Sequence, residues 1–167
     1  MAKEIPVYLF VGFLESGKTK FIQETFEDPN FDSGDKTLLL VCEEGEEEYN
    51  EKKFAFPGVT VKVLEDKAEL NPQNLLKLEK ESGAGRVVIE YNGMWLMEPL
   101  CRQVLPANWV LYQIICLMDA HTFEPYLKNM GQLVMEKVSN ADMIIFNRCN
   151  EQLRAERCEL ILKMQAD

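Results

Sequence analysis

The segment GFLESGKT at residues 12–19 carries the strongest chemical pattern in the sequence, because it has the form GxxxxGK[ST]. It follows an apolar segment, residues 7–11, and precedes a helical pattern that begins at Lys18, which is the context that this motif requires. Consecutive backbone N–H groups of such a loop, with the positive end of the following helix, point into one concavity that suits a polyphosphate. The pattern therefore predicts a phosphate-binding loop.

Individual residues of this loop have distinct chemical roles. Lys18 supplies a mobile positive charge for the β- and γ-phosphates, and the Thr19 hydroxyl is a hard oxygen ligand suited to Mg²⁺. Gly12 and Gly17 give backbone angles and clearance that a β-carbon would forbid. We expect Lys18 to be catalytic. The residues predicted to contact the nucleotide here are Gly12, Glu15, Ser16, Gly17, Lys18, Thr19 and Lys20.

A carboxylate, Glu90, ends a second apolar run, and Asp119 ends a third. Ligands of open parallel sheets bind outside the carboxyl ends of the strands, where both side chains are expected to lie. Glu90 is therefore a candidate catalytic and metal-binding residue that holds Mg²⁺ through water or orients the attacking water. The alternative is a carboxylate that caps a turn or pairs with a lysine. For Asp119 the expected role is to cap the helix that begins near Thr122.

The segment Asn147-Arg148-Cys149-Asn150 follows a strand pattern and is the candidate for recognition of the base. GTPases commonly carry Asn-Lys-x-Asp there, with the Asn fixing the loop, the basic stem over the purine and the Asp accepting hydrogen bonds from guanine. Arg148 can still cover the base. Asn150 offers one carbonyl acceptor in place of two carboxylate oxygens, so guanine selectivity stays open. The alternative for the tetrapeptide is an ordinary helix cap.

Residues 43–53, EEGEEEYNEKK, form the acidic loop, with six carboxylates in nine positions. Repulsion among these carboxylates favours an open, solvated loop. The functional alternative is a mobile element near the mouth of the sheet, which gains order from a bound cation or ligand.

Short apolar runs alternate with longer segments of helical period along the chain. This alternation is typical of an α/β fold, with a mostly parallel sheet and helices on its faces. The expected strands are residues 6–12, 37–42, 59–64, 86–91, 110–119 and 143–146, and the expected helices are residues 18–26, 72–81, 122–141, with an interruption near Gly131, and 151–165.

The length of 167 residues fits one domain with a single core. A formal net charge of −10 disfavours binding to nucleic acid or to an anionic membrane. No apolar stretch approaches the roughly 20 residues of a membrane span, and the N-terminus lacks the apolar core of a secretory signal. The five cysteines show no CxxC pair, a pattern typical of buried, reduced thiols. We therefore expect a cytoplasmic protein.

Four segments, in order along the chain, resemble motifs of the CobW/HypB/UreG family of P-loop GTPases, specifically its CobW-like branch. Residues 11–19 are similar to the GFLGxGKTT loop, residues 88–93 to hhhE-[ST]-[ST]-G, residues 117–120 to hVDA and residues 146–150 to hNKxD, where h is apolar. The resemblance covers nearly the whole chain. It implies a three-layer P-loop NTPase fold, with a mostly parallel sheet and helices on both faces, in a single nucleotide-binding domain over residues 1–167.

The resemblance also places residues 41–46 at the switch segment of the family, hNEhGE, which makes Glu43 or Glu44 a partner of Mg²⁺ beside Thr19 and Glu90. Lys20 stands where the family has a second threonine of the phosphate loop.

Two departures from the family pattern concern metal handling and length. Members that handle metals carry a CxCC cluster after the switch segment, and this sequence has no cysteine between Glu46 and Asn92. Members usually continue to a further strand and a smaller C-terminal domain. We therefore expect a fragment that lacks this domain.

The sequence thus predicts a Mg²⁺-dependent protein that binds GTP and GDP, hydrolyses GTP slowly, and acts as a switch or a metallochaperone-like accessory factor. A protein partner is expected to bind through the acidic loop and to accelerate hydrolysis, because no obvious arginine finger is present. One alternative is a metal-delivery protein that uses the acidic loop, Cys42 or His121. The other is a nucleotide-binding module without hydrolysis, in which Asn150 marks lost activity.

Overall fold

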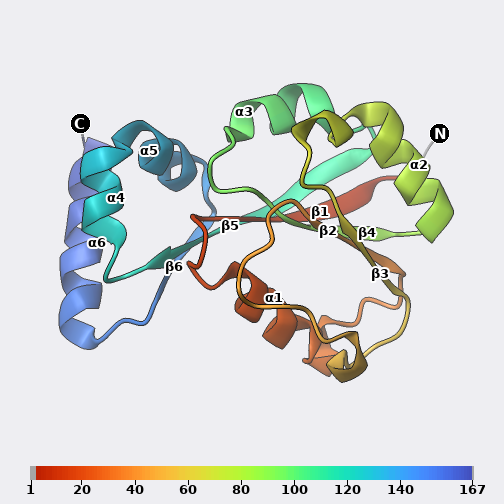
Figure 1. Cartoon of the computed structure of the whole chain (residues 1–167), viewed down its shortest axis with the longest axis horizontal. Helices are drawn as coiled ribbons and strands as arrows, with labels where there is room; N and C mark the ends of the chain where they lie inside the picture. The colour runs from red at the N-terminus through yellow and green to blue at the C-terminus, as the bar shows by residue number, and fades with distance from the viewer. Residues whose placement is uncertain (1–2, 167) are drawn as a thin grey trace.

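A six-stranded sheet runs through the middle of the molecule (Figure 1). The structure is a computed structural model that describes residues 3–166. The strand order is β3-β2-β4-β1-β5-β6, and every neighbouring pair is parallel. The strands are β1 (Ile5–Val11), β2 (Thr37–Val41), β3 (Val59–Val63), β4 (Arg86–Glu90), β5 (Trp109–Asp119) and β6 (Met143–Asn147).

Helices connect the strands and cover both faces of the sheet, which confirms the predicted three-layer α/β fold (Figure 1). Within residues 3–166 no helix combines the length and the apolar character that crossing a bilayer requires. The α-helices are α1 (Lys18–Phe26), α2 (Pro72–Ser82), α3 (Met97–Pro99), α4 (Phe123–Asn129), α5 (Gly131–Asn140) and α6 (Glu151–Ala166).

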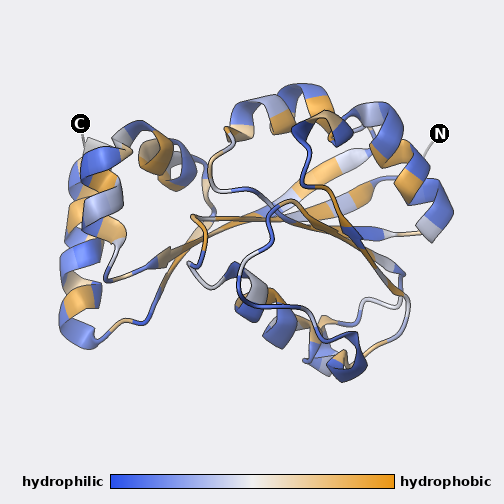
Figure 2. Ribbon diagram, viewed as in Figure 1, coloured by the Kyte–Doolittle hydropathy of each residue, from blue (hydrophilic) through white to orange (hydrophobic). Residues whose placement is uncertain are grey.

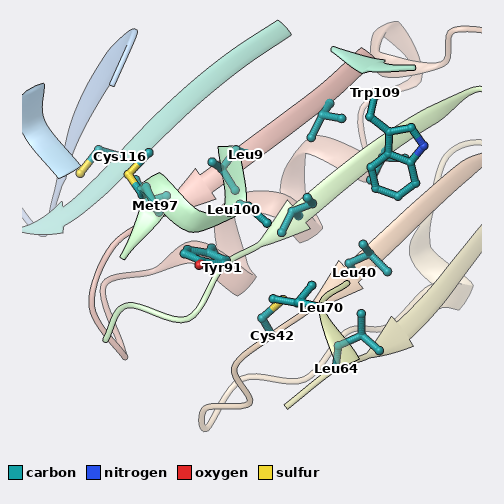
Figure 3. Packing of buried hydrophobic residues seen from close by; sticks show 14 of the residues in the cluster. Leu9, Leu40, Cys42, Leu64, Leu70, Tyr91, Met97, Leu100, Trp109 and Cys116 are labelled. Carbon is teal, nitrogen blue, oxygen red and sulfur yellow. The ribbon is translucent and has the colours of Figure 1, made fainter. Parts of the chain in front are cut away.

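The core lies on both faces of the central strands. Every residue of β2 and β4 is buried, and such strands read as continuous apolar runs because helices cover them on both sides. On one face α1 contributes Ile22 and Phe26. On the other face α2, α3 and α5 pack, and Figure 3 shows Met97 beside Leu9, Leu100 and Tyr91 there. In Figure 2 the central strands are mostly coloured as apolar, whereas the helices carry both hydrophilic and apolar residues.

The helical segment predicted at residues 122–141 divides into α4 and α5, because Met130 leaves the helical conformation with φ −134° and ψ 43°. The sequence did not predict α3 or the π-helical turn Leu100–Val104 that follows it. Both are too short to form on helix propensity alone, and the burial of Met97 and Leu100 against the sheet holds them.

The carboxyl ends of the strands gather the predicted functional segments at one edge of the sheet. Gly12 directly follows β1, while Glu90, Asp119 and Asn147 are the last residues of β4, β5 and β6. The register places Phe10 beside Glu90 and Asp119 beside Asn147. The edge is therefore the place where an open parallel sheet binds its ligand.

All five cysteines are free. Cys42, directly after β2, and Cys116, within β5, are buried, as predicted. The prediction of buried thiols is wrong for Cys101, Cys149 and Cys158, which are exposed because they lie on outward positions of the π-helical turn, of the loop after β6 and of α6.

Candidate functional site

The phosphate loop, residues 12–19, joins β1 to α1 and is held between β5 and the segment after β6. Gly12 has φ +147° and Gly17 has φ +102°, a region of φ that side chains disfavour. A Cβ at Gly12 would lie 2.3 Å from the carbonyl oxygen of Leu117, and one at Gly17 would lie 2.3 Å from Nδ2 of Asn147. Both glycines are therefore required by backbone angle and by space, as the sequence predicts.

Lys18 lies inside the phosphate loop and is 4% exposed. Its Nζ donates hydrogen bonds to the carbonyl oxygen of Gly12 and to Oε1 of Glu43, the latter at 2.7 Å. The other oxygen of this carboxylate, Oε2, accepts from the backbone N–H of Gly93 at 3.3 Å. The first carboxylate of the acidic loop is thus bound to the phosphate loop, and it lines the same cavity as Thr19.

Thr19 and Glu90 meet next to this ion pair. The Thr19 hydroxyl donates to Oε1 of Glu90 at 2.6 Å, and the Tyr49 hydroxyl donates to Oε2 at 2.6 Å. Glu90 is 2% exposed, and burial raises the pKa of its carboxyl while the two hydroxyl donors work in the opposite direction. Tyr49 was not predicted, because a single aromatic residue in an acidic run gives no signal of its contact.

The acidic loop folds across the phosphate loop. The backbone N–H of Glu46 donates to Oε1 of Glu15 at 3.0 Å, and the two loops enclose a cavity of about 120 Å³. The predicted solvated loop is right for Glu44 and Glu46–Glu48, which are exposed, and wrong for Glu43, which is drawn inward by the positive charge of Lys18.

Ser16 and Lys20 occupy opposite environments. Ser16 is 4% exposed, and its Oγ has no hydrogen-bond partner within residues 3–166. Lys20 is exposed on the first turn of α1 at the mouth of the cavity.

The end of β6 and the residue after it, Asn147 and Arg148, contact the phosphate loop. Nδ2 of Asn147 donates to the carbonyl oxygen of Ser16 at 3.3 Å, consistent with the predicted loop-fixing role. Arg148 has φ +54°, and its Nη1 donates to the carbonyl oxygen of Glu15 at 3.1 Å and to Oδ2 of Asp119 at 2.7 Å. The guanidinium is therefore bound to the phosphate loop and to Asp119. The predicted position of Arg148 over the base stays a prediction.

Asp119 and Asn150 both accept hydrogen bonds from nearby backbone N–H groups. Oδ1 of Asp119 accepts from the backbone N–H of His121 at 2.8 Å and so holds the turn before α4, whose N-cap is Thr122 and which has no side-chain cap, so the prediction that Asp119 caps this helix is wrong. Oδ1 of Asn150 accepts from the backbone N–H of Leu153 at 2.8 Å, so its carbonyl caps α6. Asn150 therefore acts as a cap, as the alternative expects, and its contact with a base stays a prediction.

A buried lysine lies beneath the phosphate loop. The Phe13 ring stacks on Tyr126 with centroids 4.1 Å apart, and Nζ of Lys137 lies 5.1 Å from the centroid of Phe13. Lys137 is 1% exposed, its amine has no hydrogen-bond partner among residues 3–166, and burial lowers its pKa. No sequence pattern indicates that this residue is buried, because one lysine in an amphipathic helix is normally exposed.

Comparison with protein families decides what this arrangement is. The model of the CobW/HypB/UreG nucleotide-binding domain matches residues 6–166, a range that includes the phosphate loop and the segment after β6. The chain belongs to the CobW/HypB/UreG family. Its phosphate loop, Glu90 and Asn147 thus lie in the nucleotide-binding domain of that family.

Individual relatives agree with this assignment. The zinc-regulated GTPase metalloprotein activator 1 of Schizosaccharomyces pombe is 27% identical over 165 residues, a match that covers 86% of this chain and 39% of the relative. The Zn(II)-bound YjiA GTPase from E. coli has the same fold, with a TM-score of 0.64 and 21% identity over 98% of this chain and 54% of that chain. A Zn(II)-bound triple mutant of YjiA GTPase gives a TM-score of 0.64 at 20% identity. The chain spans about half of the solved chains and less of the curated relative.

The side chains suited to a transition metal are spread apart in the part of the chain that the structure describes. Within residues 3–166 no group of three His, Cys, Asp or Glu side chains is arranged to hold a metal ion. Burial, followed by the nearby charge of Glu90, raises the pKa of the Cys42 thiol to about 12, which disfavours the thiolate that binds metals. His121 is exposed. Thr19 and Glu90 instead bring two hard oxygen donors together, and these fit Mg²⁺.

Proposed function

We propose that this domain binds guanosine di- and triphosphates with Mg²⁺, hydrolyses the triphosphate slowly, and uses the γ-phosphate to set the position of the acidic loop. The observation that carries the proposal is the contact between the phosphate loop and β4, where Thr19 and Glu90 lie 2.6 Å apart beside the buried amine of Lys18. Membership in a family of nucleotide-binding domains supports it.

In this proposal the main-chain amides of residues 12–19 and the amine of Lys18 bind the phosphates. Thr19 and Glu90 would hold Mg²⁺. Glu44 of the acidic loop, which lines a cavity together with Thr19, would be a further partner of the ion. A bound Mg²⁺ supplies positive charge at the β- and γ-phosphate oxygens, where negative charge develops during transfer. Glu90 then orients the attacking water, since its carboxylate already accepts two hydroxyl donors in a buried position.

We expect hydrolysis to be slow because Arg148, the arginine beside the phosphate loop, is already paired with a carboxylate. Arg148 forms an ion pair with Asp119, so its charge is partly neutralised before any phosphate binds. A protein partner is therefore proposed to supply the missing charge. The exposed side chains of Met94 and Leu96 follow Gly93, which contacts Glu43, and they offer that partner an apolar surface.

A thermal-shift series with GDP, GTP, XDP, ADP and ATP, each with and without Mg²⁺, tests the binding. A ligand at 100 times its dissociation constant stabilises the fold by about 2.7 kcal/mol. We expect the largest shifts from GDP and GTP with Mg²⁺. Equal shifts from ATP and GTP would contradict the guanine assignment.

Phosphate release over hours, at saturating GTP and Mg²⁺, tests the hydrolysis. We expect release above that of a Lys18→Ala control. Release equal to the control, from a protein that does bind GTP, would favour a nucleotide-binding module without hydrolysis.

Delivery of a metal is the second candidate function, favoured by the name of the curated relative, a zinc-regulated GTPase metalloprotein activator. Equilibrium dialysis against Zn²⁺, Co²⁺ and Ni²⁺ separates the two functions. A tight stoichiometric site would support metal delivery, with the acidic loop supplying oxygen ligands. Weak binding of all three ions would leave nucleotide binding alone.

A further inference from the structure

Glu43 is bound in the manner of a phosphate. One of its carboxylate oxygens accepts from Nζ of Lys18 at 2.7 Å and the other accepts from the backbone N–H of Gly93 at 3.3 Å. The backbone of Gly93 lies against the phosphate loop, since a Cβ on it would be 2.4 Å from the carbonyl oxygen of Gly12. The two donors thus face one small space at the rim of the loop, and an anion with two oxygens fills it.

Burial and charge make this contact strong and exclusive. The side chains of Lys18 and Glu43 are 3% and 10% exposed, so solvent screens their ion pair little. Glu90 adds a second carboxylate nearby, and the charge of Glu43 acts on it unfavourably. Lys18 therefore holds Glu43 in place despite the repulsion between Glu43 and Glu90. An anion that binds Lys18 would weaken this ion pair and so favour the release of Glu43.

We propose that Glu43 occupies the position of the terminal phosphate of a nucleoside triphosphate, so that a triphosphate must displace it whereas a diphosphate leaves it in place. Glu43 is then the residue that sets the discrimination between the two nucleotides. This inference rests on the proposed nucleotide binding and reverses the expected direction of the switch, because the γ-phosphate releases the start of the acidic loop.

The difference between the two nucleotides follows from the number of donors. A lysine amine has three N–H donors, and the Gly12 carbonyl and Glu43 each accept from Lys18, so one donor is left for the second phosphate. A third phosphate needs the Lys18 donor and the N–H of Gly93 that Glu43 uses. It also brings negative charge next to the carboxylate.

The test compares the dissociation constants of GDP and of a non-hydrolysable GTP analogue for the wild-type chain, Glu43→Gln and Glu43→Ala. We expect the ratio of the GDP constant to the analogue constant to rise about tenfold in both variants, because the triphosphate no longer competes with a carboxylate. Glu48→Gln is the matched control, since it removes the same charge from an exposed position of the same loop. Its ratio should stay within about twofold of the wild type.

Amide hydrogen exchange tests the displacement of Glu43 directly, because a change in nucleotide affinity alone would not alter the exchange rates of the acidic loop. The triphosphate analogue should speed amide exchange at residues 43–46 of the wild-type chain, GDP should not, and Glu43→Gln should exchange fast without any nucleotide.

The outcomes separate the inference from the proposed function. A ratio that stays constant or falls in the Glu43 variants, in a chain that binds both nucleotides, overturns the inference and makes Glu43 a Mg²⁺ partner while nucleotide binding stands. Tripolyphosphate and pyrophosphate repeat the comparison without a base, so the same rise in ratio supports the inference even where the guanine assignment fails. Absence of binding by all four compounds overturns both.

Discussion

The two halves of the site lie at the same edge of the sheet but differ in how their side chains are held. In the phosphate half, Lys18, Glu43 and Glu90 are largely buried: Lys18 pairs with Glu43, and Glu90 accepts from Thr19. In the base half, which is the part predicted to face the base, Arg148 and Asn150 are exposed, and each is bound to another protein group. The contacts of the phosphate half are therefore buried, whereas those of Arg148 and Asn150 are exposed and can be replaced by water or a ligand.

The difference indicates which half determines affinity and which half determines selectivity. Buried charged groups change binding strongly when they are removed, because a partner is left unpaired at low dielectric. Exposed ion pairs contribute little by comparison. Substitutions in the two halves should consequently differ in the size of their effects.

Lys18→Ala should have the largest effect, a loss of about 100-fold in affinity for a triphosphate, since it removes a charged donor from the phosphates. Isothermal titration calorimetry measures this loss. The substitution also leaves Glu43 without its cation, so the double variant Lys18→Ala, Glu43→Gln separates the effect on binding from an effect on folding. Binding that falls less than threefold in both variants would place the phosphates elsewhere.

Asn150→Asp should come next, with a gain of about tenfold in the preference for GTP over ATP, because a carboxylate offers guanine two charged acceptors. Asp caps helices as well as Asn does, so α6 should remain intact. Competition between the two nucleotides on one protein sample measures the preference. An unchanged preference means that Asn150 serves only as the cap of α6.

Arg148→Met should change nucleotide affinity less than about threefold, because the ion pair with Asp119 is half exposed on the arginine side. Titration of the variant with GDP checks this expectation. A loss of tenfold or more would show that Arg148 leaves Asp119 and stacks on the base, and it would remove the contrast between the two halves.

Lys137→Met should have the smallest effect on binding and should stabilise the fold. It replaces an unpaired buried amine under Phe13 with an apolar side chain, and the melting temperature should rise by about 2–4 °C, which corresponds to about 1 kcal/mol in a chain of this size. The exposed Lys128→Met is the matched control.

The pH dependence of this stabilisation follows from the lowered pKa of Lys137. The unfolded chain binds the proton more tightly than the folded chain, so the wild type gains stability as pH rises from the folded pKa toward 10.5. The advantage of Lys137→Met should therefore be larger below the folded pKa of Lys137 than at pH 10 and above. A constant advantage would mean that the amine is charged in the folded protein throughout this range.

The fold was largely predictable because most strands are short apolar runs, and because α2 has a clear start signal in Asn71 before Pro72. The phosphate loop was predictable for the same reason, since its geometry is encoded within residues 12–19. The turns at residues 97–104 were not, because burial against the sheet creates them.

Contacts between residues that are distant in sequence could not be predicted at the site. The pair of Lys18 and Glu43 spans 25 positions, and its formation depends on how the chain returns after β2. The contact of Tyr49 with Glu90 and that of Lys137 with Phe13 depend on the strand order and on the placement of α5. Charge pattern alone predicted a solvated loop, and it could not identify the one carboxylate that turns inward.

The contact of Asn147 with Ser16 has a consequence for biosynthesis. The phosphate loop leaves the ribosome early, but the amide that supports it is made 131 positions later. Until β6 has joined the edge of β5, Gly17 has no Asn147 beside it, and the nascent chain holds an incomplete loop. Acquisition of nucleotide affinity during translation would thus report that the last strand of the sheet has docked.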